Sequence, residues 1–270
     1  MGRIGIIILI FGSLSLIAFT QNVNEEKINF TDANGLKQGK WEKIYPNGKT
    51  AYRAFFKNDR LVGEMIRYYE NGKLMATVKY DEEGNEGHGI LYDEGGKKIA
   101  EGNYKGTNKE GEWNFYDSSG ILISKEEYVN NKRHGKIESY YKNGTLMELG
   151  FRKEDLKEGD EIFFYPSGNQ RIRSFYNKGE MHGHYIVFFD NGQKEIEGNY
   201  LNGRTNGDWI FYKPNGEIDY TIQYINGVPK DSSFLDKQQE DRFKEFEENK
   251  SKLKDPQNYA NDPDGYMRGR

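Results

Sequence analysis

Histidines and paired carboxylates are the side chains of this sequence that could support catalysis or bind a metal. The four histidines, His88, His134, His182 and His184, each lie next to a glycine that recurs along the chain. His182 and His184 flank Gly183 and could hold a metal weakly, but placement of all four at repeat boundaries favours a role in turns. We therefore predict no metal site.

Paired carboxylates such as Glu82-Glu83 and Glu126-Glu127 could serve as the acid and base of glycoside hydrolysis. That reaction needs two carboxyl groups roughly 5–10 Å apart in a cleft, and a flat ribbon of hairpins offers none. Gly-x-Ser-x-Gly, P-loop and His-Glu-x-x-His motifs are missing from the sequence. Its 270 residues include no cysteine, which excludes disulfides and thiolate chemistry. We predict a protein that is not an enzyme, with no catalytic residues and no cofactor.

The composition favours short strands joined by tight turns. Glycine (32) and aromatic residues (14%) are abundant, and a mean hydropathy of -0.95 leaves little apolar bulk for a deep core. The net charge is -4 with both signs interspersed, so no basic surface for nucleic acid is expected.

Residues 1–20 have the pattern of a signal peptide or N-terminal membrane anchor. Arg3 precedes an uncharged apolar run over residues 4–19, and Ala18 and Thr20 stand at the positions that precede a cut before Gln21. Without a cut, residues 4–24 are just long enough to span a bilayer. The expected location is periplasmic, cell-surface or secreted, with no integral membrane domain beyond this segment.

Two series of glycines recur every 24 residues, and we interpret both as structural turn glycines. The first series is Gly39, Gly63, Gly87, Gly111, Gly135, Gly159, Gly183 and Gly207, and the second is Gly48, Gly72, Gly96, Gly120, Gly144, Gly168, Gly192 and Gly216. Asn-Gly dipeptides such as Asn47-Gly48 are flanked by strand-forming residues. Each unit therefore reads as strand, tight turn, strand and a looser turn between units.

Alternation within the strands predicts two faces. One position of the second strand is aromatic in all units but one. This ladder is Phe56, Tyr80, Tyr104, Tyr128, Tyr176, Tyr200 and Tyr224, with Arg152 in the remaining unit. Two residues earlier, several units have a small residue such as Gly102 or Gly198. A small residue there leaves room for a bulky one across the strand pair, and Trp41, Trp113 and Trp209 are the candidates.

A second aromatic stripe follows the end of the first strand. Its members are Tyr45, Tyr69, Tyr141, Tyr165 and Phe189. Core packing and cross-strand stacking account for such a stripe. The alternative is a binding surface, and these five residues are then the candidate binding residues.

The sequence thus predicts an all-β fold: an elongated, twisted, single-layer antiparallel sheet of eight 24-residue β-hairpins over residues 21–230. Ile28 and Phe30 fall in register with the second strands and predict a half-unit that protects the N-terminal edge. Residues 231–270 are predicted to form a charged helix, docked on the last hairpin as a cap, and a flexible tail.

The units GKWEKIYPNGK, GEMIRYYENGK, GKIESYYKNGT and GDWIFYKPNGE resemble the MORN-repeat variant of bacterial proteins named for the YwqK-family antitoxins. The resemblance covers residues 35–230. It implies an elongated β-hairpin sheet and a role in contacts with proteins or surfaces, and the antitoxin label implies neutralisation of a toxin. In this chain Gly89 replaces the bulky residue of the third unit, and Asp93 and Asp117 replace the second aromatic.

Three functions remain open on the sequence. The first is an extracytoplasmic repeat module for protein–protein interaction or scaffolding, with an unknown protein as partner. The second is a cell-surface glycan or peptidoglycan binder, in which aromatic rungs stack on sugar rings. The third is an antitoxin that acts on a co-exported toxin.

Overall fold

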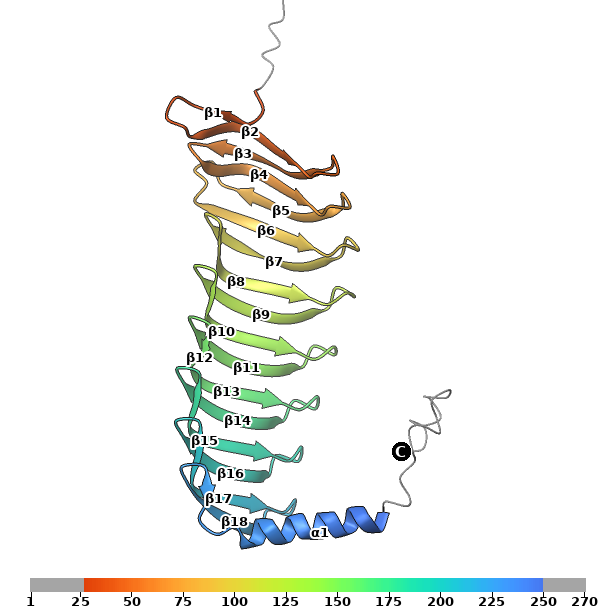
Figure 1. The fold of residues 1–270 in the computed structure, drawn as a ribbon, viewed down its shortest axis with the longest axis vertical. Helices are drawn as coiled ribbons and strands as arrows, with labels where there is room; N and C mark the ends of the chain where they lie inside the picture. The colour runs from red at the N-terminus through yellow and green to blue at the C-terminus, as the bar shows by residue number, and fades with distance from the viewer. Residues whose placement is uncertain (1–26, 250–270) are drawn as a thin grey trace, which may run out of the picture.

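A computed structural model describes residues 27–249 of the chain, which form one 19-stranded antiparallel sheet and one helix (Figure 1). The elements are β1 (Phe30–Thr31), β2 (Lys37–Ile44), β3 (Thr50–Lys57), β4 (Arg60–Tyr68), β5 (Leu74–Tyr80), β6 (Glu86–Tyr92), β7 (Lys98–Lys105), β8 (Asn108–Tyr116), β9 (Leu122–Val129), β10 (Lys132–Tyr140), β11 (Leu146–Lys153), β12 (Leu156–Lys157), β13 (Gly159–Phe164), β14 (Gln170–Asn177), β15 (Glu180–Phe188), β16 (Lys194–Leu201), β17 (Arg204–Tyr212), β18 (Ile218–Ile225), β19 (Val228–Pro229) and α1 (Ser233–Asn249). The predicted leader (residues 1–20) and tail (residues 250–270) lie outside the described residues.

The predicted fold class is confirmed. Consecutive strands pair antiparallel from β1 to β19, except that β12 and β13 both pair with β11. The eight 24-residue units each form one hairpin, the first from β2 and β3 and the last from β17 and β18. The hairpins follow one another down a single curved layer (Figure 1). At about 4.8 Å per strand, the distance from β2 to β18 is roughly 80 Å.

The two kinds of turn are the reverse of those predicted. The Asn-Gly turns, predicted to be tight, are the wider ones: Gly48 donates its N–H to Tyr45 O (2.9 Å), and Gly48 alone of these residues has a positive φ, +82°. Between units, all turns but the one before β6 are two-residue turns; in the first, between β3 and β4, Asn58 and Asp59 both have positive φ. This is the backbone of a type I′ turn, which asparagine and aspartate tolerate.

The first glycine series lies inside strands and not in turns, which corrects its interpretation. Gly63 belongs to β4, where Ala54 of β3 faces three residues because the register jumps from Phe55–Val62 to Arg53–Ile66. A positive φ of +63° at Gly63 lets the strand make this bulge. Gly87 differs from the rest of the series: β5 and β6 pair without a bulge, and the loop before β6 is longer.

The core is a column of rings along one face, and it confirms the predicted pairing of small with bulky residues. Trp113 is fully buried, with Tyr104 and Tyr128 edge-on at 5.1 and 6.4 Å between ring centroids. A Cβ on Gly102 would lie 2.4 Å from the Trp113 ring, so only glycine fits opposite it. Gly198 makes the same room for Trp209 in the last unit. Such ring pairs contribute about 0.5–1.5 kcal/mol each beyond burial.

The two ends of the sheet are closed by different means. At the N-terminal edge, the Asn29 side chain donates to Glu42 O and accepts from Glu42 N–H, as a neighbouring strand would. Phe30 pairs with Gln38, which confirms a short leading strand. At the other edge, Pro229 ends β19 after two residues because proline has no N–H for the ladder.

Helix α1 does not dock on the last hairpin, and the predicted cap is wrong. The helix projects from the end of the sheet (Figure 1), with Phe243 65% and Phe246 51% exposed. Its apolar residues are too few to hold it against a strand edge. Within residues 27–249, no helical segment combines the length and apolar character that a membrane span requires.

Candidate functional site

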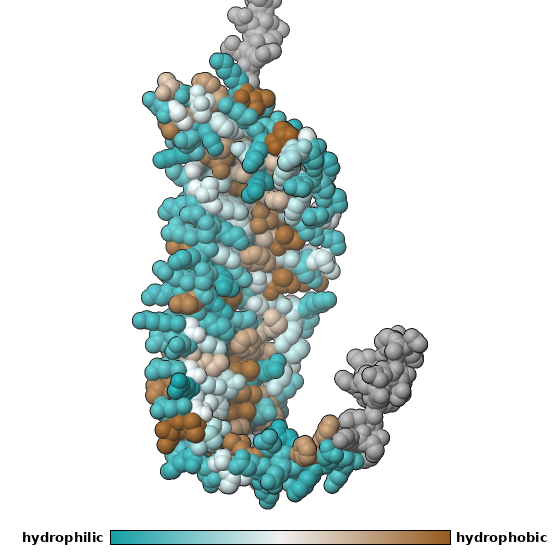
Figure 2. All heavy atoms as spheres, in the orientation of Figure 1, coloured by the Kyte–Doolittle hydropathy of each residue, from teal (hydrophilic) through white to brown (hydrophobic). Residues whose placement is uncertain are grey.

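One face of the first three hairpins has a groove made of two adjoining hollows. We call this face, which presents Trp41, Met65 and Trp113, the aromatic face. The first hollow, of about 650 Å³, is lined by Tyr45, Tyr52, Met65 and Arg67 among others, and the second, of about 370 Å³, shares Met65 and Arg67. We call the two hollows together the N-terminal groove. Apolar residues form a strip down the length of the sheet between polar margins (Figure 2).

The groove is apolar and aromatic, and two exposed cations line it. Lys43 in β2 and Arg67 in β4 occupy the same position of consecutive units. Among residues 27–249, neither makes an ion pair with a carboxylate. Burial raises the pKa of the Tyr104 hydroxyl, and the positive charge of Arg67 opposes that rise. The groove therefore offers positive charge beside apolar surface.

The predicted aromatic stripe lines the same face, but its hydroxyls are already engaged. Tyr45 donates to Tyr68 O (2.8 Å) and Tyr69 donates to Tyr92 O (2.6 Å). Each bond joins one unit to the strand end of the next. The same bond joins Tyr141 to Phe164 O (2.7 Å) and Tyr165 to Phe188 O (2.8 Å), and Phe189 has no hydroxyl to donate. All five rings are half-buried.

These tyrosines therefore have a structural role between units. Tyr45 and Tyr69 also line the groove with one face of their rings, whereas Tyr141, Tyr165 and Phe189 lie farther along the array, outside it. The groove brings together two of the five predicted binding residues. Binding by these residues stays a prediction.

A second, more polar hollow of about 630 Å³ lies where the third unit meets its neighbours. His88 contacts Asn103 through Nδ1 and Oδ1 (2.9 Å), and Asp81 accepts backbone N–H bonds from Glu83, Asn85 and Glu86. These backbone bonds, that from Asn85 above all, hold the pKa of Asp81 below its ordinary value. Both signs of charge line this hollow, so it selects no class of ligand.

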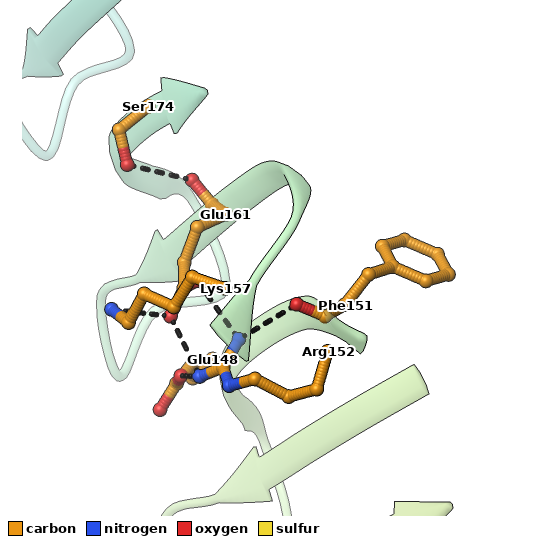
Figure 3. Close-up of polar contacts among 6 residues, drawn as sticks. All are labelled: Glu148, Phe151, Arg152, Lys157, Glu161 and Ser174. Atoms are coloured by element: carbon orange, nitrogen blue, oxygen red, sulfur yellow. Dashed lines mark hydrogen bonds and ion pairs between the residues drawn. The ribbon is translucent and has the colours of Figure 1, made fainter. Parts of the chain in front are cut away.

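A cluster of charged side chains interrupts the ring column where the fifth unit meets the sixth (Figure 3). Arg152 makes a two-pronged contact with Glu161, Nη1 to Oε2 at 3.0 Å and Nη2 to Oε1 at 3.1 Å. Arg152 also reaches Glu148 (3.2 Å), and Lys157 reaches Glu161 (2.8 Å). Arg152 is 8% and Glu161 1% exposed, so this is a desolvated ion pair.

Glu148 and Glu161 lie in the same cluster but titrate differently. Burial raises the pKa of Glu148, and the neighbouring Glu161 raises it further. Burial also acts to raise the pKa of Glu161, but hydrogen bonds with Glu148, Lys157 and Arg152 outweigh it and leave that pKa lowered. Glu161 is therefore the ionised partner of Arg152.

The histidines lie near unit boundaries but inside strands, so their predicted role in turns is wrong: His88 is in β6, His134 in β10, and His182 and His184 in β15. His184 Nε2 lies 3.2 Å from Asp160 Oδ1, and both side chains are exposed. The part of the chain that the structure describes has no group of three or more potential metal ligands. The expectation of a protein without metal, cofactor or catalysis stays a prediction.

Comparison with known families identifies the units. Six segments match the family described as "MORN repeat variant": residues 37–58, 61–82, 109–130, 133–154, 181–202 and 205–226. These six segments are MORN-variant repeats. The third and sixth hairpins are the two that do not match. In the third hairpin, Gly89 stands at the position of the bulky core residue. In the sixth hairpin, Glu161 stands at that position.

Other comparisons add little. No curated protein matches the sequence. Among solved structures, a TcdB2-TccC3-Cdc42 complex is 11% identical, with a TM-score of 0.16, over 69% of this chain and 14% of that one. The Tc holotoxin pore of Photorhabdus luminescens with mutation TccC3-D651A is 11% identical, with a TM-score of 0.15, over 74% and 14%. This chain thus spans about a seventh of either, and TM-scores this low support no statement about fold or function.

Sequence reasoning missed the N-terminal groove and the charged cluster. Both had a signal in the 24-residue register. Lys43 and Arg67 are one period apart, and Glu161 stands where Trp41 and Trp113 stand in their units. Alignment of the units by this register finds a charged residue, Glu161, in a core position, and a cation at the same position of the first two units.

Proposed function

We propose that this protein is a non-enzymatic interaction module that binds another protein through the N-terminal groove. MORN repeats are generally protein- or ligand-binding modules. The observation that carries the proposal is a pair of exposed cations, Lys43 and Arg67, that line an apolar and aromatic groove and have no carboxylate partner among residues 27–249. A positive charge beside apolar surface suits a ligand that is itself both apolar and acidic.

The composition of the groove supports a protein as its ligand. Tyrosine, methionine and arginine are the residue types enriched at the cores of protein interfaces, and Tyr52, Met65 and Arg67 meet in the first hollow. The floor is a paired sheet, so it is rigid and loses little conformational freedom on binding. We infer that the partner presents apolar side chains flanked by carboxylates.

We further propose that the module acts outside the cytoplasm. The support is the apolar run of residues 4–19 behind Arg3. Fractionation of cells followed by mass analysis of the intact protein tests this. An envelope or secreted form, either beginning at Gln21 or retaining the leader as an anchor, is expected. Full-length protein confined to the cytosol would remove this part of the proposal.

A capture experiment tests the groove. The full chain is immobilised and exposed to envelope extract, beside the variant Lys43→Glu/Arg67→Glu and the control Lys125→Glu on the opposite face. The proposal expects a protein retained by the wild type and the control and lost, by about tenfold, on the groove variant. Equal retention by all three forms would refute it. Retention on peptidoglycan that both variants keep would favour the glycan-binding alternative.

A further inference from the structure

We propose that the N-terminal groove receives helix α1 of a second copy of this chain. The inference rests on the proposed function, because it names the protein segment that the groove binds. The groove presents Lys43 and Arg67 near one end of the array, and helix α1, which is acidic overall, projects from the other end (Figure 1).

The helix carries an apolar stripe that its own chain leaves uncovered. Phe243 and Phe246 are 65% and 51% exposed and lie one turn apart. At 100° per residue, Glu240 and Glu247 fall about 40–60° from Phe243 and line one flank of the stripe. The helix has six acidic and three basic residues, so its charge is opposite to that of the groove.

The dimensions of the helix and the groove agree. A 17-residue helix is about 25 Å long, and the groove crosses β2 to β7, six strands that span roughly 24 Å. Glu240 and Glu247 are about 10 Å apart along the helix axis. Lys43 and Arg67 lie two strands apart, also about 10 Å. A helix laid across the strands therefore places two carboxylates over two cations, with Phe243 between them.

The occupant must come from another molecule. Helix α1 starts beside β18, and ten strand spacings separate β18 from β7, roughly 50 Å. This is about twice the length of the helix. Helix α1 projects across the long axis of its own array (Figure 1), so a helix laid across the strands of the groove places the two arrays at a steep angle, with the end of one array on the first hairpins of the other.

The lack of cysteine in the sequence makes a crosslinking test clean. Full-length chains carrying Met75→Cys in the groove are mixed with chains carrying Gln239→Cys beside Phe243, and a short bismaleimide is added. The proposal expects a covalent dimer in the mixture, well above the yield of either variant alone. Chains with Lys125→Cys on the opposite face replace the groove variant as the matched control. An equal yield with this control would overturn the proposal.

A charge exchange makes the test specific. In the Met75→Cys chain, Lys43→Glu/Arg67→Glu should lower the crosslink yield about tenfold. Adding Glu240→Lys/Glu247→Lys to the Gln239→Cys chain should restore it, which a folding defect could not produce. Failure of the exchange to lower and then restore the yield would overturn the proposal.

The outcomes separate the two proposals. If no dimer forms while capture from envelope extract still depends on Lys43 and Arg67, the second copy is the wrong occupant and the proposed function stands. If the dimer forms as expected, both are supported. If neither crosslinking nor capture depends on these cations, both are refuted.

Discussion

The charged cluster between the fifth and sixth units gives the sharpest test of the packing. Arg152→Met removes the cation that pairs with Glu161, which is 1% exposed. In this variant Lys157, which is 34% exposed, is the one cation among residues 27–249 that still contacts Glu161. Breaking a buried ion pair by removing one partner costs about 3–5 kcal/mol, because the other charge is left buried and uncompensated. We expect that loss here.

A double variant tests the reason for the loss. Arg152→Tyr/Glu161→Trp restores the residue types that other units have at these positions. The room for a tryptophan exists, because Gly150 stands where Gly102 and Gly198 make room for Trp113 and Trp209. Replacing a buried ion pair by well-packed apolar residues is neutral or stabilising by about 1–4 kcal/mol. The double variant should therefore be at least as stable as the wild type.

Amide hydrogen exchange of β11 to β14 is the assay, since it reports local opening in a repeat array that need not unfold in one step. Arg152→Met should lower protection there by roughly 100-fold or more. As a control, Arg53→Met breaks the exposed pair of Arg53 with Glu42 (2.9 Å) and should cost under about 1 kcal/mol. Equal effects of the two single variants, or a double variant as weak as Arg152→Met, would refute the reasoning.

Three further predictions concern the repeat itself. Tyr141→Phe removes the 2.7 Å hydrogen bond to Phe164 O and should lower the free energy of unfolding, measured in urea, by about 0.5–1.5 kcal/mol. An unchanged free energy of unfolding would show that this bond does not stabilise the array. Gly198→Ala places a Cβ about 2.4 Å from the Trp209 ring and should cost about 1–3 kcal/mol, and an unchanged midpoint would mean that the ring moves freely. Burial raises the pKa of Tyr80 to about 12. The unfolded chain therefore loses this proton first, and stability should fall as pH rises from about 10 to 12; Tyr80→Phe should reduce that fall.

The architecture could be predicted because the 24-residue period constrains every unit alike. Two glycines per period, strand alternation and Trp113 opposite Gly102 leave one consistent arrangement, a row of hairpins. The turns were misassigned because both turn types use Asn and Gly. Only the backbone shows that Asn58 and Asp59 both take positive φ while Gly48 does so alone in its turn.

The candidate site was less predictable, since it depends on side chains from different units. From the sequence, Arg67 is interpreted as one of many solvated charges. Its neighbours in sequence do not show that it lines an apolar groove without a carboxylate partner. The sequence likewise did not predict that α1 projects away from the sheet. The sequence shows a polar helix after the last hairpin, but not whether Phe243 and Phe246 face the sheet or solvent.

Photo-crosslinking from the N-terminal groove tests the central claim most directly. A photo-reactive phenylalanine analogue replaces Met75 in the groove of the full chain, and a second form carries it at Lys125 on the opposite face. The account predicts protein adducts from position 75 that are lost with Lys43→Glu/Arg67→Glu and are weak or missing from position 125. Equal adducts from both positions, or adducts from position 75 that persist without the two cations, would contradict it.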